Sequence, residues 1–277
     1  MTDKGWIALD IDGTVTEDKY SIPLPVIAYL KVLAATGWKI AFATGRSYKF
    51  AMIALSALDF PYYFLPQNGS VALKMPEVHV IEKNYIPFEQ LQFAESGIDK
   101  ADCDCLVYAG FDSGDSGFYR PSHFSPKGQA YIDELQRREK EHWTQLTTFS
   151  KCGLSEFPLL KYFGSHEQMD FIEAKLSARF HVTKIKDPFY QDVQLLLVTA
   201  KHASKGLSLA RLMEKEGRGS KVIAAGDDSN DISLFEQADV KIAMPHAPKF
   251  LLDKANLIAP PTSQLGIIAA LTEAIAR

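Results

Sequence analysis

The chain has 277 residues, of which 47% are apolar and 23% are charged, with a formal net charge of −4 and a pI near 6.0. This length suits one large domain or two moderate ones, and the apolar content is ample for a buried core. The small negative charge excludes an electrostatic footprint for nucleic acid or for an anionic membrane, although a local basic pocket for a phosphate is compatible with it.

Strands and helices alternate over the first 70 residues. Strands are expected at 6–9, 39–43 and 62–65, where short apolar runs end in polar residues, and helices at 21–37 and 47–58. Pro23 and Pro25 suit the start of the first helix. Such an alternation predicts an α/β fold with a doubly wound parallel sheet.

The pattern changes after about residue 74. The next stretch contains two expected helices, at 126–143 and 167–179. Four strands are expected there in a less regular order, at 105–109, 159–163, 181–186 and 193–199. This arrangement predicts a small α+β insert.

The first pattern then resumes, with helices expected at 204–216, 232–237 and 265–276 and strands at 222–225 and 240–244. A core interrupted by one long insert explains this order better than two consecutive domains. We therefore expect a Rossmann-like core of residues 1–75 and 192–277 and an inserted domain of residues 76–191.

Cys103, Cys105 and Cys152 are odd in number and lack the spacing of a zinc site, so we expect free thiols. The N-terminus reaches an acidic turn after four apolar residues, too few for a signal peptide, and no apolar run approaches the roughly 18 residues that span a bilayer. A cytoplasmic protein, as a monomer or small homo-oligomer, is the expectation.

Asp10-Ile11-Asp12-Gly13-Thr14 follows the first strand. Ligands of open α/β sheets bind beyond the carboxyl ends of the strands, so two carboxylates at this position can serve one substrate from different angles. Gly13 lets the backbone turn sharply and bring its N–H near an anion. An acidic loop without function is the alternative, but four fixed positions at a strand end favour function.

Two weaker motifs suit phosphate binding. Thr44-Gly45-Arg46 follows the second strand and offers a hydroxyl and a glycine N–H, while Arg46 suits a surface role equally well. Ser204-Lys205 opens a helix, where a compact positive charge beside the helix N-terminus favours phosphate. Taken alone, each is more often an ordinary turn, helix cap or solvated surface group.

Gly226-Asp227-Asp228-Ser229-Asn230-Asp231 follows the strand at 222–225 and forms an oxygen-rich turn. Mg²⁺ prefers such ligands, and the spacing does not continue into an EF-hand loop.

These four motifs, in this order and at these places, resemble the haloacid dehalogenase superfamily. The position of the insert is similar to the second type of cap domain, found in the Cof-like hydrolases, the sucrose-phosphate phosphatases and the phosphomannomutases. Asn68-Gly69 and the stretch at 240–247 also resemble the Cof-like pattern, except that Pro245-His246 stand where that family usually has Gly-Asn.

The resemblance implies a Mg²⁺-dependent phosphatase with an aspartyl-phosphate intermediate. Asp10 maps to the nucleophile and Asp12 to the general acid/base. Other roles follow from the same resemblance: phosphate binding by Gly13, Thr44, Gly45 and Lys205; metal binding by Asp10, the Asp12 backbone carbonyl and Asp227; support by Asn230 and Asp231, through water or by holding Lys205; and a substrate rim that includes Asn68 and Arg46.

The insert is expected to choose the substrate, a small phosphorylated metabolite such as a sugar phosphate. Arg120, His123 and Lys161 are candidate contacts there, whereas Tyr108, Phe118 and Tyr119 suit its core better. Two other functions stay open: a phosphomutase of the phosphomannomutase type, and a binding or regulatory protein without turnover.

Overall fold

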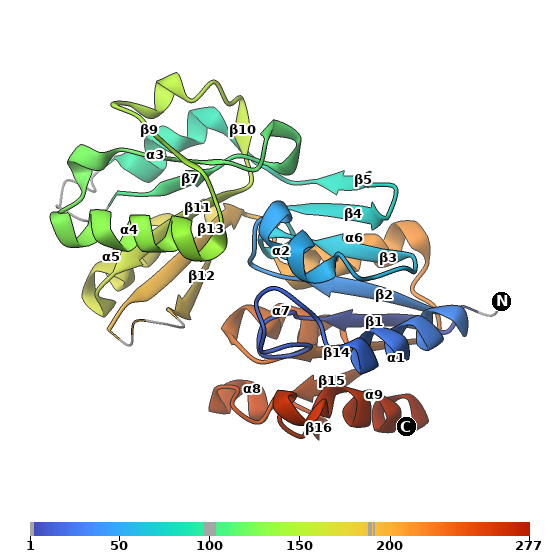
Figure 1. Ribbon diagram of the computed structural model, residues 1–277. Helices are drawn as coiled ribbons and strands as arrows, with labels where there is room; N and C mark the ends of the chain where they lie inside the picture. Colours follow the sequence, from blue (N-terminus) through green and yellow to red (C-terminus); the bar gives the residue numbers. More distant parts are fainter. Residues whose placement is uncertain (1–2, 97–103, 188–189, 191) are drawn as a thin grey trace. The chain divides into compact units, whose positions relative to one another are not determined.

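The computed structural model describes residues 3–96, 104–187, 190 and 192–277, which form two compact units (Figure 1). The larger unit comprises Met1–Arg46, Ala51–Lys83 and Ser204–Arg277, and the inserted unit comprises Ser47–Phe50 and Asn84–Ala203. None of the helices in these described ranges is both long and apolar enough to cross a bilayer.

The larger unit is built on an eight-stranded sheet with the strand order β16-β15-β14-β1-β2-β3-β4-β5. The strands from β16 to β3 are parallel, and β4 and β5 are added antiparallel at one edge. Their bounds are β1 Gly5–Leu9, β2 Trp38–Ala43, β3 Tyr62–Leu65, β4 Val71–Met75, β5 His79–Lys83, β14 Lys221–Gly226, β15 Val240–Ala243 and β16 Leu257–Ile258. The predicted doubly wound parallel sheet is confirmed.

Helices cover both faces of this sheet, as an all-parallel region requires. On one face α6 (Lys205–Glu216) and α7 (Ile232–Gln237) pack together over a core that includes Trp6 and Ala8. The alternate residues of β1 point to the other face, where α1 (Leu24–Ala35) packs against α9 (Gly266–Ala276). Two shorter helices are α8 (Lys249–Leu252) and α2 (Tyr48–Leu55), of which Tyr48–Phe50 are counted with the inserted unit.

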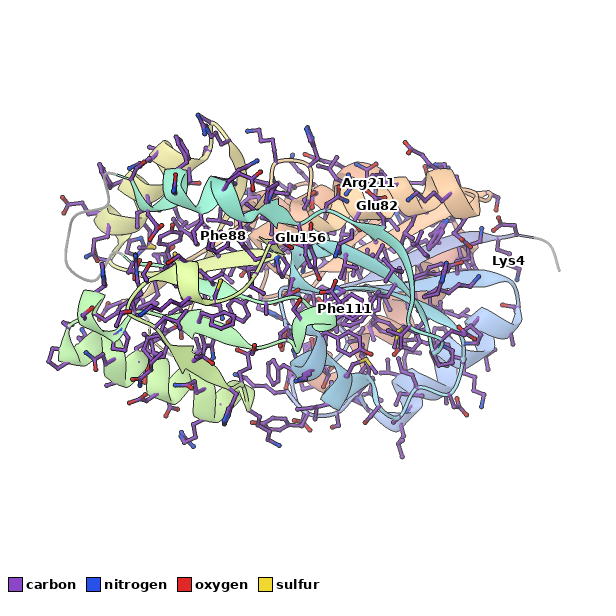
Figure 2. All side chains as sticks on the ribbon, turned by 90° about the horizontal axis from the view of Figure 1, so that it is seen from above. Lys4, Glu82, Phe88, Phe111, Glu156 and Arg211 are labelled. Atoms are coloured by element: carbon purple, nitrogen blue, oxygen red, sulfur yellow. The ribbon has the colours of Figure 1, made fainter. Side chains whose placement is uncertain are left out.

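Ion pairs connect strand β5, at the antiparallel edge of the sheet, to helix α6. Glu82 of β5 forms ion pairs with Arg211 and with Lys215 of α6, and Figure 2 shows Glu82 beside Arg211. Because β5 pairs with β4 in the large sheet, the larger unit extends to Lys83, beyond the expected boundary at residue 75.

The inserted unit has a six-stranded sheet with the order β12-β13-β11-β7-β8-β9, antiparallel except between β8 and β9. The bounds are β7 Leu106–Tyr108, β8 Gly117–Tyr119, β9 Trp143–Gln145, β11 Leu159–Gly164, β12 Phe180–Lys186 and β13 Gln194–Ala200, with a separate ribbon of β6 Ile86–Pro87 and β10 Glu156–Phe157. The expected insert ended at residue 191, but β13 pairs with β11 and β12, so this unit continues to Ala203.

Among the described residues of this unit, three helices lie on the sheet. Helices α3 (Leu91–Glu95) and α5 (His166–Leu176) share one apolar cluster, and α4 (Pro126–Glu139) lies in another. Helix α4 was expected to reach residue 143, but it ends at Glu139 because Lys140 adopts a left-handed conformation with φ 53°.

The side chains singled out in the insert are mostly structural. Tyr108 and Tyr119 are buried in the cluster with α4, and Phe118 packs against the other cluster, in agreement with a core role. Arg120 donates to both carboxylate oxygens of Asp104 and to Glu95, so it is held inside the unit as an ion-pair partner.

Lys161 is buried with its ammonium 5.2 Å from the ring centre of Tyr108, whereas His123 is exposed. Cys105 and Cys152 are free thiols, as expected, and Cys103 lies outside the described residues.

Candidate active site

Three neighbouring parallel strands of the larger unit end in the predicted site residues. Asp10 follows β1, Thr44 follows β2 and Asp227 follows β14, and β1 lies between the other two strands. The backbone N–H of Asp10 donates to the Ala225 carbonyl at 3.0 Å, which holds the ends of β1 and β14 side by side. Parallel pairing therefore brings side chains 217 residues apart in the chain to one edge of the sheet.

Gly13 makes the close approach of the two loops possible. Its φ is 73°, and a Cβ at this position would lie 2.3 Å from Asp227 Oδ2 and 3.0 Å from His246 Nε2. Any side chain here would be both strained and in collision with the carboxylate. The turn that the sequence predicted at Gly13 thus packs the backbone against Asp227.

Lys205 is buried between two carboxylates. Its ammonium donates to Asp10 Oδ1 at 2.6 Å and to Asp231 Oδ1 at 2.7 Å. Burial lowers the pKa of Lys205, but the charges and hydrogen bonds of Asp10 and Asp231 outweigh that effect and hold the pKa above its ordinary value. Lys205 is therefore a permanent cation that fixes one oxygen of Asp10.

Asp231 holds the turn that carries Asp227. Its Oδ2 accepts from the backbone N–H groups of Asp227 at 2.9 Å and Asp228 at 3.1 Å, while its Oδ1 accepts from Lys205. The expected role of Asp231 in holding Lys205 agrees with this contact. Asn230 instead donates from its side chain to Asn68 Oδ1 at 3.1 Å.

Asp10, Asp227 and Asp231 form a cluster in which one oxygen of each lies within 4.8 Å of the others. Burial is the largest cause that raises the pKa of Asp10 well above its ordinary value; the charge of Lys205 opposes it, and Asp231 and Asp227 add to it. Burial, and then the charge of Asp231, raise the pKa of Asp227 to about 8.

The charges of this cluster fit a divalent cation. Three carboxylates face one ammonium, so full ionisation leaves two uncompensated negative charges in a buried place. Buried charge without a partner is strongly unfavourable, and oxygen ligands of this kind suit Mg²⁺. The residues present therefore fit the metal that the sequence predicted.

Asp12 has a partner that sequence reasoning missed. Arg46 donates from Nε to Asp12 Oδ2 at 2.7 Å and from Nη2 to Asp12 Oδ1 at 2.5 Å, and from Nη1 to the Lys19 carbonyl. The Arg46 side chain is 4% exposed and that of Asp12 53%. The surface position that the sequence left open for Arg46 is wrong, because its guanidinium is buried on the carboxylate.

Thr44 and Asn68 are joined by the backbone behind the site. The Thr44 hydroxyl accepts from the Arg46 N–H at 3.1 Å, which leaves its own hydrogen to donate, and the Thr44 carbonyl accepts from the Asn68 N–H at 2.8 Å. Gly45 lies between Thr44 and Arg46 in this turn. Asn68 is 2% exposed with φ 54°, so it is part of the interior of the site.

His246 also reaches the acidic cluster. Its Nε2 lies 2.9 Å from Asp227 Oδ2, and its side chain is half exposed. The sequence marked Pro245-His246 only as a departure from a family pattern, because no periodicity links residue 246 to residue 227.

The chain is similar in sequence to known proteins. Residues 7–271 match the family described as haloacid dehalogenase-like hydrolase. Pyridoxal phosphate phosphatase YbhA of Escherichia coli is 23% identical over 268 residues, which cover 91% of this chain and 92% of that protein.

Solved structures agree in fold. A haloacid dehalogenase-like hydrolase from Bacteroides thetaiotaomicron has a TM-score of 0.77 at 21% identity, covering 98% of this chain and 100% of that one. The subclass IIB sugar phosphatase BT4131 has a TM-score of 0.73 at 19% identity, with coverages of 98% and 100%.

Proposed function

This chain belongs to the haloacid dehalogenase-like hydrolases, as a phosphatase of that family, and we propose that it hydrolyses phosphomonoesters with Mg²⁺ through a phosphorylated Asp10. The observation that carries the proposal is the Asp10 carboxylate, held by buried Lys205 beside Asp227 and Asp231 at the end of the parallel sheet. The proposed substrates are small metabolites, with sugar phosphates as the first class to test.

In the first step Asp10 attacks phosphorus. Lys205 holds Oδ1, so Oδ2 is the oxygen that forms the new P–O bond while the bond from phosphorus to the substrate oxygen breaks. Asp12 gives a proton to the departing alkoxide. Lys205, the Thr44 hydroxyl and the backbone N–H groups of Gly13 and Gly45 hold the phosphoryl oxygens, since positioning and charge stabilisation dominate phosphoryl transfer.

In the second step water removes the phosphoryl group. Asp12, now a carboxylate, takes a proton from the water as its oxygen bonds to phosphorus, and the bond from phosphorus to Asp10 breaks. Inorganic phosphate leaves and the Asp10 carboxylate is restored. Arg46, by donating to both oxygens of Asp12, fixes the orientation of this carboxylate.

Asp10, Asp227 and the Asp12 backbone carbonyl are the proposed metal ligands, with Asp231 behind them. Bound Mg²⁺ supplies charge neutralisation, which lets Asp10 stay ionised near a phosphate dianion. Substrate choice is assigned to the inserted unit, as the family resemblance implies.

A metabolite screen tests the function. Purified protein with Mg²⁺ is incubated with about a hundred phosphorylated metabolites, and both free phosphate and isomerised hexose phosphate are measured. Phosphate release from one substrate class supports the phosphatase. Isomerisation without release would instead identify a phosphomutase, and no turnover on any substrate would favour a non-catalytic binding protein.

Mg²⁺ should stabilise the protein more at alkaline than at acidic pH. The pKa of Asp227 is raised from 3.8 to about 8, so between these two values the metal-free folded protein holds a proton that the unfolded chain has released. The free energy of unfolding of the metal-free protein therefore falls as the pH rises from about 4 to about 8. At a hundredfold excess over its Kd, Mg²⁺ should add about 2.7 kcal/mol, or roughly 5–10 °C in Tm, at about pH 9. Thermal unfolding with Mg²⁺ and with chelator checks this; an equal shift at about pH 6 would contradict it.

Arg46→Lys should lower kcat without raising KM. Lysine cannot make the two parallel bonds to Asp12, so proton transfer should slow by about 10–100-fold, within the range that general acid/base catalysis contributes. Steady-state kinetics with an alkyl phosphate measure both constants. The loss should shrink on p-nitrophenyl phosphate, whose leaving group departs without a proton. A raised KM with unchanged kcat would return Arg46 to the expected substrate rim.

A further inference from the structure

His246 is placed by a tight turn that its sequence favours. The turn runs from Met244 to Ala247, closed by a 3.0 Å bond from the Ala247 N–H to the Met244 carbonyl, and both end residues are buried. Pro245 occupies the second position of the turn, where its fixed φ is preferred. The half-exposed His246 therefore stands on a turn whose ends are anchored in the core.

The same turn is bonded to the strand that carries Asp227. The Met244 N–H donates to the Gly226 carbonyl at 3.1 Å, so β15 and β14 end together and residue 246 lies next to residue 227. This backbone contact explains why the imidazole Nε2 comes within 2.9 Å of Asp227 Oδ2.

The imidazole also faces the Asp10–Gly13 loop. A Cβ on Gly13 would touch both Asp227 Oδ2 and His246 Nε2, so the backbone at Gly13 borders both groups. The Asp12 carbonyl, a proposed metal ligand, is bonded directly to the Gly13 nitrogen. Nε2 therefore lies beside the Asp227 carboxylate and the Gly13 backbone, and the His246 side chain is more exposed than that of Asp227.

The spacing of Nε2 and Oδ2 suits two ligands of one ion. Donors at about 2.1 Å from an octahedral cation lie about 3.0 Å apart when they occupy adjacent corners. The 2.9 Å separation of His246 Nε2 and Asp227 Oδ2 matches that edge. A shared cation would replace the present hydrogen bond, with the imidazole proton carried on Nδ1.

We propose that His246 is an additional nitrogen ligand of the cation held by Asp227, and that it gives this site a preference for divalent transition metals, such as Mn²⁺ and Co²⁺, over Mg²⁺. The inference rests on the proposed metal site and adds a ligand to it. Imidazole suits first-row transition metals, whereas Mg²⁺ binds through oxygen and retains its waters.

The test is metal binding by metal-free protein, measured by titration calorimetry with Mg²⁺, Mn²⁺ and Co²⁺. His246→Asn should lose about 10–100-fold in Co²⁺ and Mn²⁺ affinity and about threefold or less in Mg²⁺ affinity. The Co²⁺ absorption spectrum and the nitrogen coupling of bound Mn²⁺ in electron spin-echo spectra should change with it. His79→Asn is the matched control, because His79 is an exposed histidine of the same unit.

Equal loss for all three metals, or unchanged Mn²⁺ and Co²⁺ binding with no nitrogen coupling in the wild type, would overturn the inference. His246→Gln, compared by circular dichroism, covers the case in which the asparagine variant does not fold. Release of phosphate from p-nitrophenyl phosphate by wild-type protein with Mg²⁺ is measured separately. This assay shows whether the proposed phosphatase function stands when the His246 result is negative. Absence of any metal binding would contradict both the His246 proposal and the proposed metal site.

Discussion

Asp10→Asn is expected to abolish turnover, with a loss in kcat of about 10³–10⁶-fold, while the protein stays folded. The amide has nearly the shape of the carboxylate but cannot form the P–O bond that starts the reaction. It also removes one negative charge from a buried cluster in which three carboxylates share one ammonium. The metal-free variant should therefore unfold at the same temperature as wild type or higher.

Rapid acid quench with labelled substrate measures the intermediate directly. Wild-type protein should carry a label that hydroxylamine releases, as an acyl phosphate does, and Asp10→Asn should carry none. Asp59→Asn is the matched control, since Asp59 is an exposed aspartate of the same unit that pairs with Lys31 on the surface. Label that persists in Asp10→Asn would show that another residue is the nucleophile.

Lys205→Met is expected to lower the free energy of unfolding by about 3–5 kcal/mol at neutral pH, more than any other substitution proposed for this protein. Lys205 is 1% exposed, and its ammonium is bonded to Asp10 and Asp231. Its removal leaves both carboxylates buried without that cation. The free energy of unfolding, measured in urea melts, should therefore fall. The loss should shrink in acid, because burial raises the pKa of Asp10 and a protonated Asp10 no longer needs the cation.

Two comparisons sharpen this prediction. Lys249→Met removes an ammonium that pairs with Asp253 on the surface, and it should change stability by about 0.5 kcal/mol or less. Adding Asp231→Asn to Lys205→Met should recover part of the loss, because the second change removes one of the stranded charges. A Lys205→Met protein as stable as wild type would mean that Lys205 does not balance these carboxylates. Such a result would also weaken its proposed phosphate role.

Most of the larger unit could be predicted because its elements are locally encoded. Short apolar strands followed by polar turns, alternating with helical spacing, specify a parallel sheet. The unit boundaries were harder: the expected limits of the insert, 76–191, include β5 and exclude β13, although the strand expected at 193–199 was counted with the insert. The residues of β13 carry the pattern of a strand, whereas no strand was predicted at β5. For both segments the pairing partners decide which sheet they join.

By itself, the sequence determined that Asp10, Thr44 and Asp227 each follow a strand, and parallel topology then requires these ends to meet at one edge. Only the tertiary structure decided that Arg46 donates hydrogen bonds to Asp12 and that His246 contacts Asp227. The physical reason is that both contacts join side chains of separate loops. Their meeting depends on turn closure, side-chain rotamers and burial, none of which leaves a period or a spacing in the chain.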